Sequence, residues 1–130
     1  MRYVILCLLT SILLFINSCN TNSINIDNLV FPATNVSYQN QVQPFMQFYC
    51  TYGGCHSDTP TNGASVMSDW VSLYSTENLG LIVPTNPDGS KLYQTVNKGK
   101  LPHNPYLYWT FKDNHVQGIR QWILEGGKNN

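Results

Sequence analysis

Charged side chains are scarce in this chain of 130 residues. They make up 11% of the sequence, against roughly a quarter in an average soluble domain, and the formal net charge is zero. A protein that binds nucleic acid needs a basic face to neutralise phosphates, so this composition argues against a nucleic-acid partner. Aromatic residues, in contrast, reach 12%. A small domain with this balance has either a very apolar core or a cofactor to enclose.

Alternating apolar and polar residues, the pattern of a half-buried strand, are also missing. Short helices are predicted instead at 44–50, 68–74 and 90–97. A clearer one follows a plausible N-cap at Asp113, where Val116, Ile119, Trp122 and Ile123 repeat at helical spacing before two C-terminal glycines. The predicted fold class is all-α, a single domain of short helices and long loops. Such helices bury little apolar surface by themselves, which favours a further group in the core.

The longest apolar run lies at the N-terminus, between Tyr3 and Ile16. It follows a single positive residue, Arg2, and is too short for an ordinary membrane-spanning helix. The run ends at Asn17-Ser18-Cys19, which resembles the cleavage site of a bacterial lipoprotein signal. Residues 1–18 are therefore predicted to be a signal peptide, with a lipid on Cys19. A plain signal peptide and a short anchor helix are the alternatives.

That prediction sets the compartment and the organisation of the chain. The protein would be exported to the periplasmic or cell-surface side of a membrane and anchored there by its lipid. Residues 19–35 are rich in Asn, Ser and Thr and are predicted to be a flexible tether. The folded domain is predicted to cover residues 36–130.

Only two of the four cysteines remain for other roles in this scheme. Cys7 leaves with the signal peptide and Cys19 carries the lipid, so Cys50 and Cys55 are left. They lie in the stretch CTYGGCHS, in which His56 directly follows the second cysteine. Outside the cytoplasm, two nearby cysteines form a disulfide or are consumed by a thioether-linked cofactor.

Three interpretations of this stretch remain open on the residues alone. The usual signature of haem attachment has two residues between the cysteines, and here there are four. Haem chemistry still works if the insertion loops out, which Gly53 and Gly54 make easy. A zinc site would need a fourth ligand, for which His103 and His115 are the histidine candidates, and it is the least favoured interpretation. A plain disulfide, with the histidine incidental, is the third.

Segments along the rest of the chain carry a family resemblance. They are VSYQNQVQPFMQFYCTYGGCHS, SDWVSL, IVPTNPDGSKLYQTVNKGKLP and VQGIRQWILEGGKNN. Their order is similar to that in small single-haem cytochrome c domains of exported bacterial proteins, the group that includes planctomycete-type cytochrome c domains. The resemblance covers about residues 36 to 130.

The resemblance implies a cytochrome c-like fold around one covalent haem c. In it Cys50 and Cys55 would be the thioether anchors and His56 the proximal iron ligand. An N-terminal helix would cross the C-terminal helix. Trp70, Tyr93 and Trp122 are the aromatic residues expected to pack around the haem.

The chain departs from the family pattern at the sixth iron ligand. Such domains place a methionine before a proline after the third helix, and here Leu101 precedes that proline. His103 is the main candidate to replace it, and Met67 a remote one. Met46 is expected in the core and His115 in solvent. An open iron site is the remaining alternative.

The function that follows from these expectations is electron transfer by a membrane-tethered c-type cytochrome. The protein would not be an enzyme, and its partners would be redox proteins. The first alternative is a haem-based gas or redox sensor, or a small haem enzyme, with an open distal site. The second is a haem-free lipoprotein module that is stapled by a disulfide and binds something else.

Overall fold

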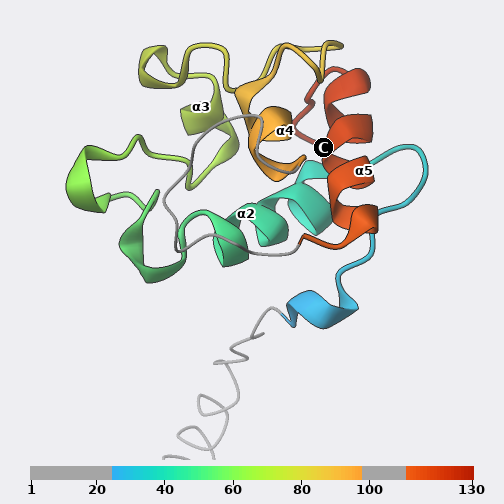
Figure 1. Ribbon diagram of the computed structural model, residues 1–130, viewed down its shortest axis with the longest axis horizontal. Helices are drawn as coiled ribbons and strands as arrows, with labels where there is room; N and C mark the ends of the chain where they lie inside the picture. The colour runs from blue at the N-terminus through green and yellow to red at the C-terminus, as the bar shows by residue number, and fades with distance from the viewer. Residues whose placement is uncertain (1–24, 98–110) are drawn as a thin grey trace, which may run out of the picture.

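The computed structural model of the chain describes residues 25–97 and 111–130, apart from the side chain of Asn62 (Figure 1). Four α-helices occur there: α2 (Gln43–Tyr49), α3 (Trp70–Leu73), α4 (Lys91–Val96) and α5 (Asp113–Leu124). Short 3₁₀ or π turns are η1 (Ile26–Asn28), η2 (Tyr38–Val42), η3 (Tyr52–Gly54), η4 (Thr61–Gly63) and η5 (Thr76–Asn78). No strand occurs in the described ranges, so the predicted all-α class is confirmed. The predicted lipidation site Cys19, Leu101 and His103 lie outside them.

Local side-chain bonds explain where several of these elements begin. The Ser37 hydroxyl accepts the backbone N–H of Asn40 at 3.2 Å and starts η2, which runs directly into α2 with Pro44 in its first turn. Asp69 and Ser72 form a reciprocal capping box on α3. α5 begins one residue earlier than predicted, because Lys112 occupies the N-cap and Asp113 is the first helical residue.

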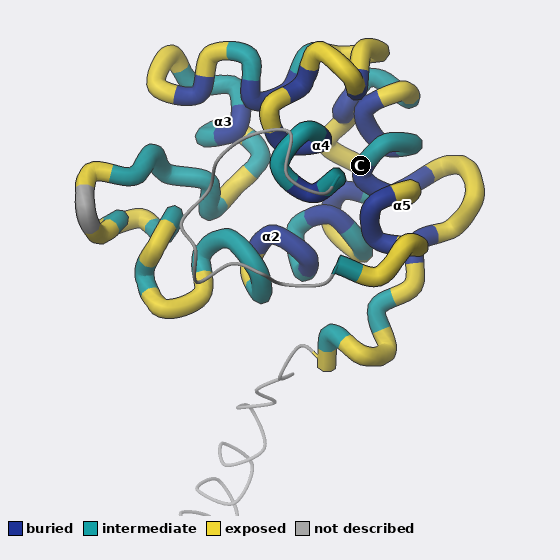
Figure 2. The backbone as a smooth tube through the Cα atoms, viewed as in Figure 1, coloured by how far each residue is buried: buried dark blue, intermediate teal, exposed yellow. Residues whose placement is uncertain are grey.

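The core lies between α2, α4 and α5, where the buried positions of the three helices face each other (Figure 2). Helix η2–α2 packs against α5 near both of its ends. Tyr38 lies 5.8 Å from Trp122 between ring centroids, and Phe45 lies 5.7 Å from the ring of His115. Met46 is 1% exposed, as expected for a core residue. These contacts join helix η2–α2 to α5, and the loops of the domain lie between these two segments in the chain.

Within the described residues 25–35, the predicted tether packs against the folded domain, contrary to its assignment as a flexible segment. Phe31 is 3% exposed, and the Asn114 side chain holds its backbone from both sides. The Phe31 N–H donates to Asn114 Oδ1 at 2.8 Å, and Asn114 Nδ2 donates to the Phe31 carbonyl at 2.9 Å. A Cβ on Gly118 would lie 2.1 Å from the Phe31 ring, so α5 needs glycine at that point. The predicted boundary at residue 36 is therefore too late, because Leu29 and Phe31 supply apolar anchors within a polar stretch.

Replacing Phe31 with alanine tests this packing. The substitution removes a buried ring from α5, so the free energy of unfolding should fall by about 3 kcal/mol. Val30, its neighbour, is 67% exposed, and Val30→Ala should change stability by less than about 0.5 kcal/mol. Urea denaturation of both variants and the wild type measures the difference. Equal stability of the two variants would mean that the segment is a tether after all.

Candidate functional site

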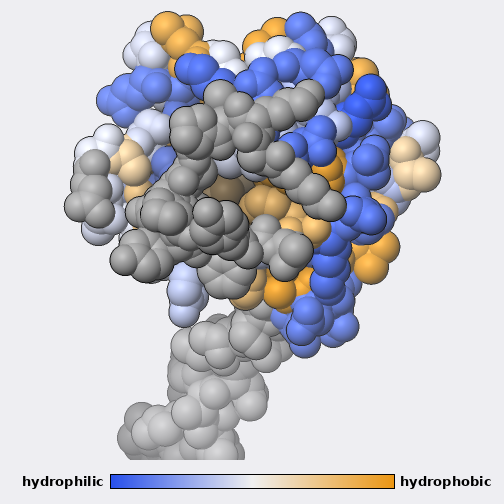
Figure 3. Space-filling view, in the orientation of Figure 1, coloured by the Kyte–Doolittle hydropathy of each residue, from blue (hydrophilic) through white to orange (hydrophobic). Residues whose placement is uncertain are grey.

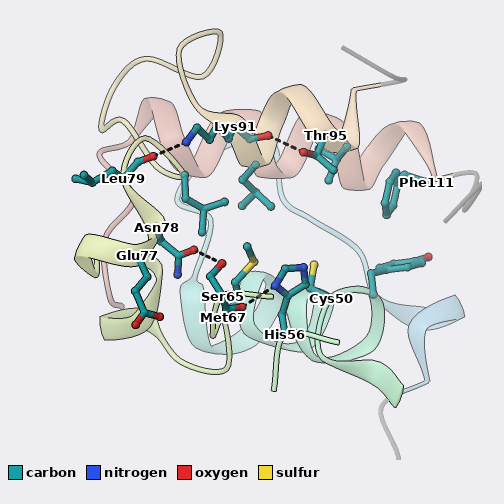
Figure 4. A pocket seen from close by; sticks show the side chains of 14 residues that line it. Cys50, His56, Ser65, Met67, Glu77, Asn78, Leu79, Lys91, Thr95 and Phe111 are labelled. Atoms are coloured by element: carbon teal, nitrogen blue, oxygen red, sulfur yellow. Dashed lines mark hydrogen bonds between the residues drawn. The ribbon is translucent and has the colours of Figure 1, made fainter. Parts of the chain in front are cut away.

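A cavity of about 270 Å³ opens between the loops and the helices (Figure 4). Cys50, His56, Ser65 and Met67 lie on one side of it, and α4 lies on the other. Most of its described walls are apolar. The further apolar lining residues are Tyr49, Leu79, Leu81, Leu92, Val96 and Phe111. The further polar ones are Glu77, Asn78, Lys91 and Thr95. Apolar surface also shows near the centre of this face of the molecule, with hydrophilic surface to its right (Figure 3). Such a lining, with a few converging polar groups, is typical of a ligand site.

The loop between Cys50 and His56 closes on itself. The backbone N–H of His56 donates to the Cys50 carbonyl at 3.1 Å, which keeps the two residues together. The inserted residues form the turn η3, in which Gly53 and Gly54 have φ angles of 66° and 83°. Glycine adopts these angles without a steric penalty. The insertion therefore loops out, as the sequence analysis required.

The His56 ring is oriented by a backbone carbonyl. Its Nδ1 lies 2.7 Å from the Ser65 carbonyl oxygen. Because a carbonyl only accepts, this bond requires the proton on Nδ1 and leaves the lone pair of the neutral ring on Nε2. Metal-binding histidines are fixed in the same way, by a hydrogen bond to the nitrogen that does not bind the metal. The backbone of His56 is held too, since its carbonyl accepts the Met67 N–H at 2.9 Å.

The two described cysteines are both free thiols and differ in environment. Cys50 is half-buried and lines the cavity, with its sulfur 3.7 Å from the Met46 sulfur. Burial raises the pKa of Cys50 to about 12, with the nearby Cys55 as a second cause. The thiol therefore stays protonated at neutral pH, which disfavours a thiolate–metal bond. Cys55 is exposed and does not line the cavity.

Zinc finds no support in the described part of the chain. A structural zinc site needs four converging ligands. Within residues 25–97 and 111–130, no three side chains of the types His, Cys, Asp and Glu come together in a metal-binding arrangement.

Three aromatic residues predicted to pack against a haem do not line the cavity. Trp122 is 1% exposed and donates from Nε1 to the Lys128 carbonyl at 2.9 Å. Trp70 donates to the Gly127 carbonyl at 2.8 Å, and the Tyr93 hydroxyl accepts from Asn97 Nδ2 at 3.1 Å. Tyr93 and Trp122 belong to the helix core, and Trp70 packs against it.

Among the described residues, the aromatic rings that line the cavity are those of Tyr49 and Phe111, which meet edge to face with their centroids 5.0 Å apart. Both were overlooked as site residues, although Tyr49 directly precedes Cys50 and that position was a usable signal. Ser65 and Asn78, which lie in loops, were overlooked as well. No sequence period marks them.

The part of the cavity wall that faces His56 comes from α4 and the loop before it. Leu92 and Val96 lie there, and the described residues of this wall include no imidazole or thioether. Met67 lies on the same side as His56, to which its backbone is bonded, so it is not placed as an opposing ligand (Figure 4).

His115 stands behind the aromatic end of the cavity and contradicts the expectation that it faces solvent. It is 0% exposed, between Phe31, Phe45 and Tyr49. Its Nε2 donates to the Leu29 carbonyl at 3.0 Å, and its Nδ1 is buried with no hydrogen-bond partner among the described residues. Burial lowers the pKa of His115, and the charge of Lys112 lowers it further against the opposing effect of the bond to Leu29. The prediction failed because the first turn of α5 is covered by the N-terminal segment.

The lowered pKa of His115 makes the stability of the fold depend on pH. As the pH falls below about 6.5, the unfolded chain binds a proton at this histidine before the folded chain does. The free energy of unfolding should therefore decrease between pH 7 and pH 5. His115→Gln retains an N–H for the Leu29 carbonyl but cannot titrate, and its urea midpoint should fall less over this interval. An equally steep fall in both proteins would contradict this origin of the pH dependence.

Comparison of the chain with protein-family models, with curated proteins and with solved structures found no match in any of the three. Over the described ranges, every helix is too short or too polar to cross a bilayer. The chemistry of the cavity is therefore the basis for inferring a function.

Proposed function

We propose that this protein is an electron-transfer protein of the c-type cytochrome kind. One covalent haem would be held by Cys50 and Cys55 and ligated by His56. The observation that carries the proposal is the His56 ring, which a carbonyl holds in the tautomer that a metal ligand needs, beside a protonated thiol in an apolar wall.

The residues of the chain fit the attachment chemistry. Each thiol adds its S–H across a vinyl group, so one S–C bond forms, the hydrogen moves to the other vinyl carbon, and no oxidant is needed. Cys50 lines the cavity as a thiol. Cys55 has to turn inward, and the two positive-φ glycines before it make that turn inexpensive.

The cavity suits a flat apolar group that is only partly enclosed. Its volume of about 270 Å³ is just below the roughly 300–1,000 Å³ of common ligand sites, so a haem would fill it and extend beyond it. Leu81, Leu92 and Val96 would exclude water from one face. When bound, the haem supplies a one-electron couple of the iron, and its exposed edge is where electrons would pass to a partner.

The cytochrome c-like topology belongs to the same proposal, as does the cellular setting. The chain would be exported, anchored to a membrane through a lipid on Cys19, and paired with redox proteins on that surface. It would carry electrons and alter no substrate.

A second candidate function is supported by the wall opposite His56. Its described residues include the aliphatic Leu92 and Val96, and this arrangement also suits an open iron site. A haem-based sensor of small gases, or a small haem enzyme, would use such a site. His103, outside the described residues, is the ligand whose presence would decide against it.

Covalent attachment is tested by producing the full chain with a c-type haem-maturation system. A red band should survive a denaturing gel for the wild type and vanish for the double variant Cys50→Ser/Cys55→Ser. Tyr52→Ala, in the inserted turn and 70% exposed, is the matched control and should keep the band. A colourless wild type with a Cys50–Cys55 disulfide would exclude both haem functions and favour the haem-free module.

Carbon monoxide separates the two haem functions. If His103 is the sixth ligand, the reduced wild type should bind carbon monoxide slowly or not at all, and His103→Ala should bind it rapidly, with a shifted Soret band. Rapid binding by the wild type, unchanged in the variant, would assign an open iron site.

A further inference from the structure

Asn78 is a buried polar residue that no part of the proposed function has used. It ends the turn η5, is 6% exposed, and lines the cavity near Ser65 (Figure 4). Burying a side-chain amide is costly unless every polar atom has a partner. A buried amide in a loop therefore needs an explanation in terms of the groups that it holds.

Every polar atom of the Asn78 side chain is paired. Its Oδ1 accepts the Ser65 hydroxyl at 2.5 Å. Its Nδ2 donates to the Val66 and Ser72 carbonyls, both at 2.7 Å. Since both partners of Nδ2 are carbonyls, the amide has only one orientation that satisfies all three bonds.

These bonds hold the segment that orients His56. Asn78 binds the Ser65 side chain and the next carbonyl, that of Val66, so it holds the chain on both sides of the Ser65 carbonyl. That carbonyl accepts the His56 Nδ1–H at 2.7 Å. A continuous set of hydrogen bonds therefore runs from Asn78 through Ser65 to the imidazole, and Figure 4 shows two of its links as dashed lines.

We propose that Asn78 is a positioning residue, which fixes the Ser65 carbonyl and through it the tautomer and orientation of the His56 ring. Asn78 acts through its hydrogen bonds to the Ser65 hydroxyl and the Val66 carbonyl, and it would not itself contact the iron. The effect of Asn78 on the reduction potential of a bound haem rests on the proposed function. A firm Nδ1–H bond strengthens electron donation from Nε2 to a metal and stabilises the ferric state, so a loosened bond should raise the reduction potential.

The test uses the full chain as purified, labelled with ¹⁵N-histidine, and two measurements. NMR gives the solvent-exchange rate of the His56 Nδ1 proton, and a redox titration gives the midpoint potential. In Asn78→Ala the proton should exchange on the order of tenfold faster than in the wild type, because the carbonyl is no longer held. The midpoint potential should rise.

Two further variants make the result specific. Ser65→Ala removes only the hydroxyl and leaves the carbonyl. The exchange rate and the midpoint potential should therefore shift in the same direction as in Asn78→Ala, but by less. This variant also tests the inference if Asn78→Ala does not fold. Ser90→Ala is the matched control. Ser90 is 0% exposed and bonds to the Val83 and Asn86 backbones, with no bond to the His56 segment. Its loss should lower stability and leave both His56 measurements unchanged.

The outcomes separate this inference from the proposed function. A wild type without haem contradicts the proposed function, while the NMR measurement still tests Asn78. The inference would be overturned if Asn78→Ala had the same Nδ1 proton exchange rate and midpoint potential as the wild type. Equal shifts in Ser90→Ala would also overturn it, as would an Nδ1 proton that is unprotected in the wild type.

Discussion

The hydrogen bond between the His56 ring and the Ser65 carbonyl is the interaction on which the candidate site depends. It places a proton on Nδ1, so that the neutral ring carries its lone pair on Nε2. The bond can orient the ring only because the backbone on both sides of it is held in place. His56 is tied to Cys50 by its own N–H, and Ser65 is tied to Asn78 by its hydroxyl. Two loop segments, the first of which contains the turn η3, therefore hold one side chain in a defined orientation.

The helices contribute a rigid frame more than they contribute functional groups. Helix η2–α2 and α5 pack through aromatic and aliphatic side chains, and the Asn114 clamp adds the segment around Phe31 to the same core. α2 ends where Cys50 begins the site loop, and α4 closes the cavity with Leu92 and Val96. The rest of the described cavity wall comes mainly from loops, and the proposed covalent group would give these loops an apolar surface to pack against.

The sequence predicted those features that have a period or a local motif. The clear apolar repeat of α5 gave its position to within one residue, and the spacing of Cys50, Cys55 and His56 marked the site loop. Prediction from the sequence failed where a contact joins segments that are far apart in the chain. His115 looks exposed in the first turn of a helix, and only the fold shows that Leu29 and Phe31 cover it. Asn78 and Ser65 lie thirteen residues apart without any pattern, because the hydrogen bond between them is a product of the folded loops. Trp122 and Tyr93, which are expected next to a haem, pack in the helix core and are not among the described residues that line the cavity.

The central claim is that Cys50, Cys55 and His56 form one haem-binding unit. Tandem mass spectrometry of the proteolytic peptide that spans residues 50–56, from protein produced with haem maturation, tests it most directly. The account predicts a peptide that carries one haem, with fragments that place a thioether on each cysteine. A peptide without haem and two hydrogen atoms lighter than its reduced form would show a disulfide in its place and would contradict the account.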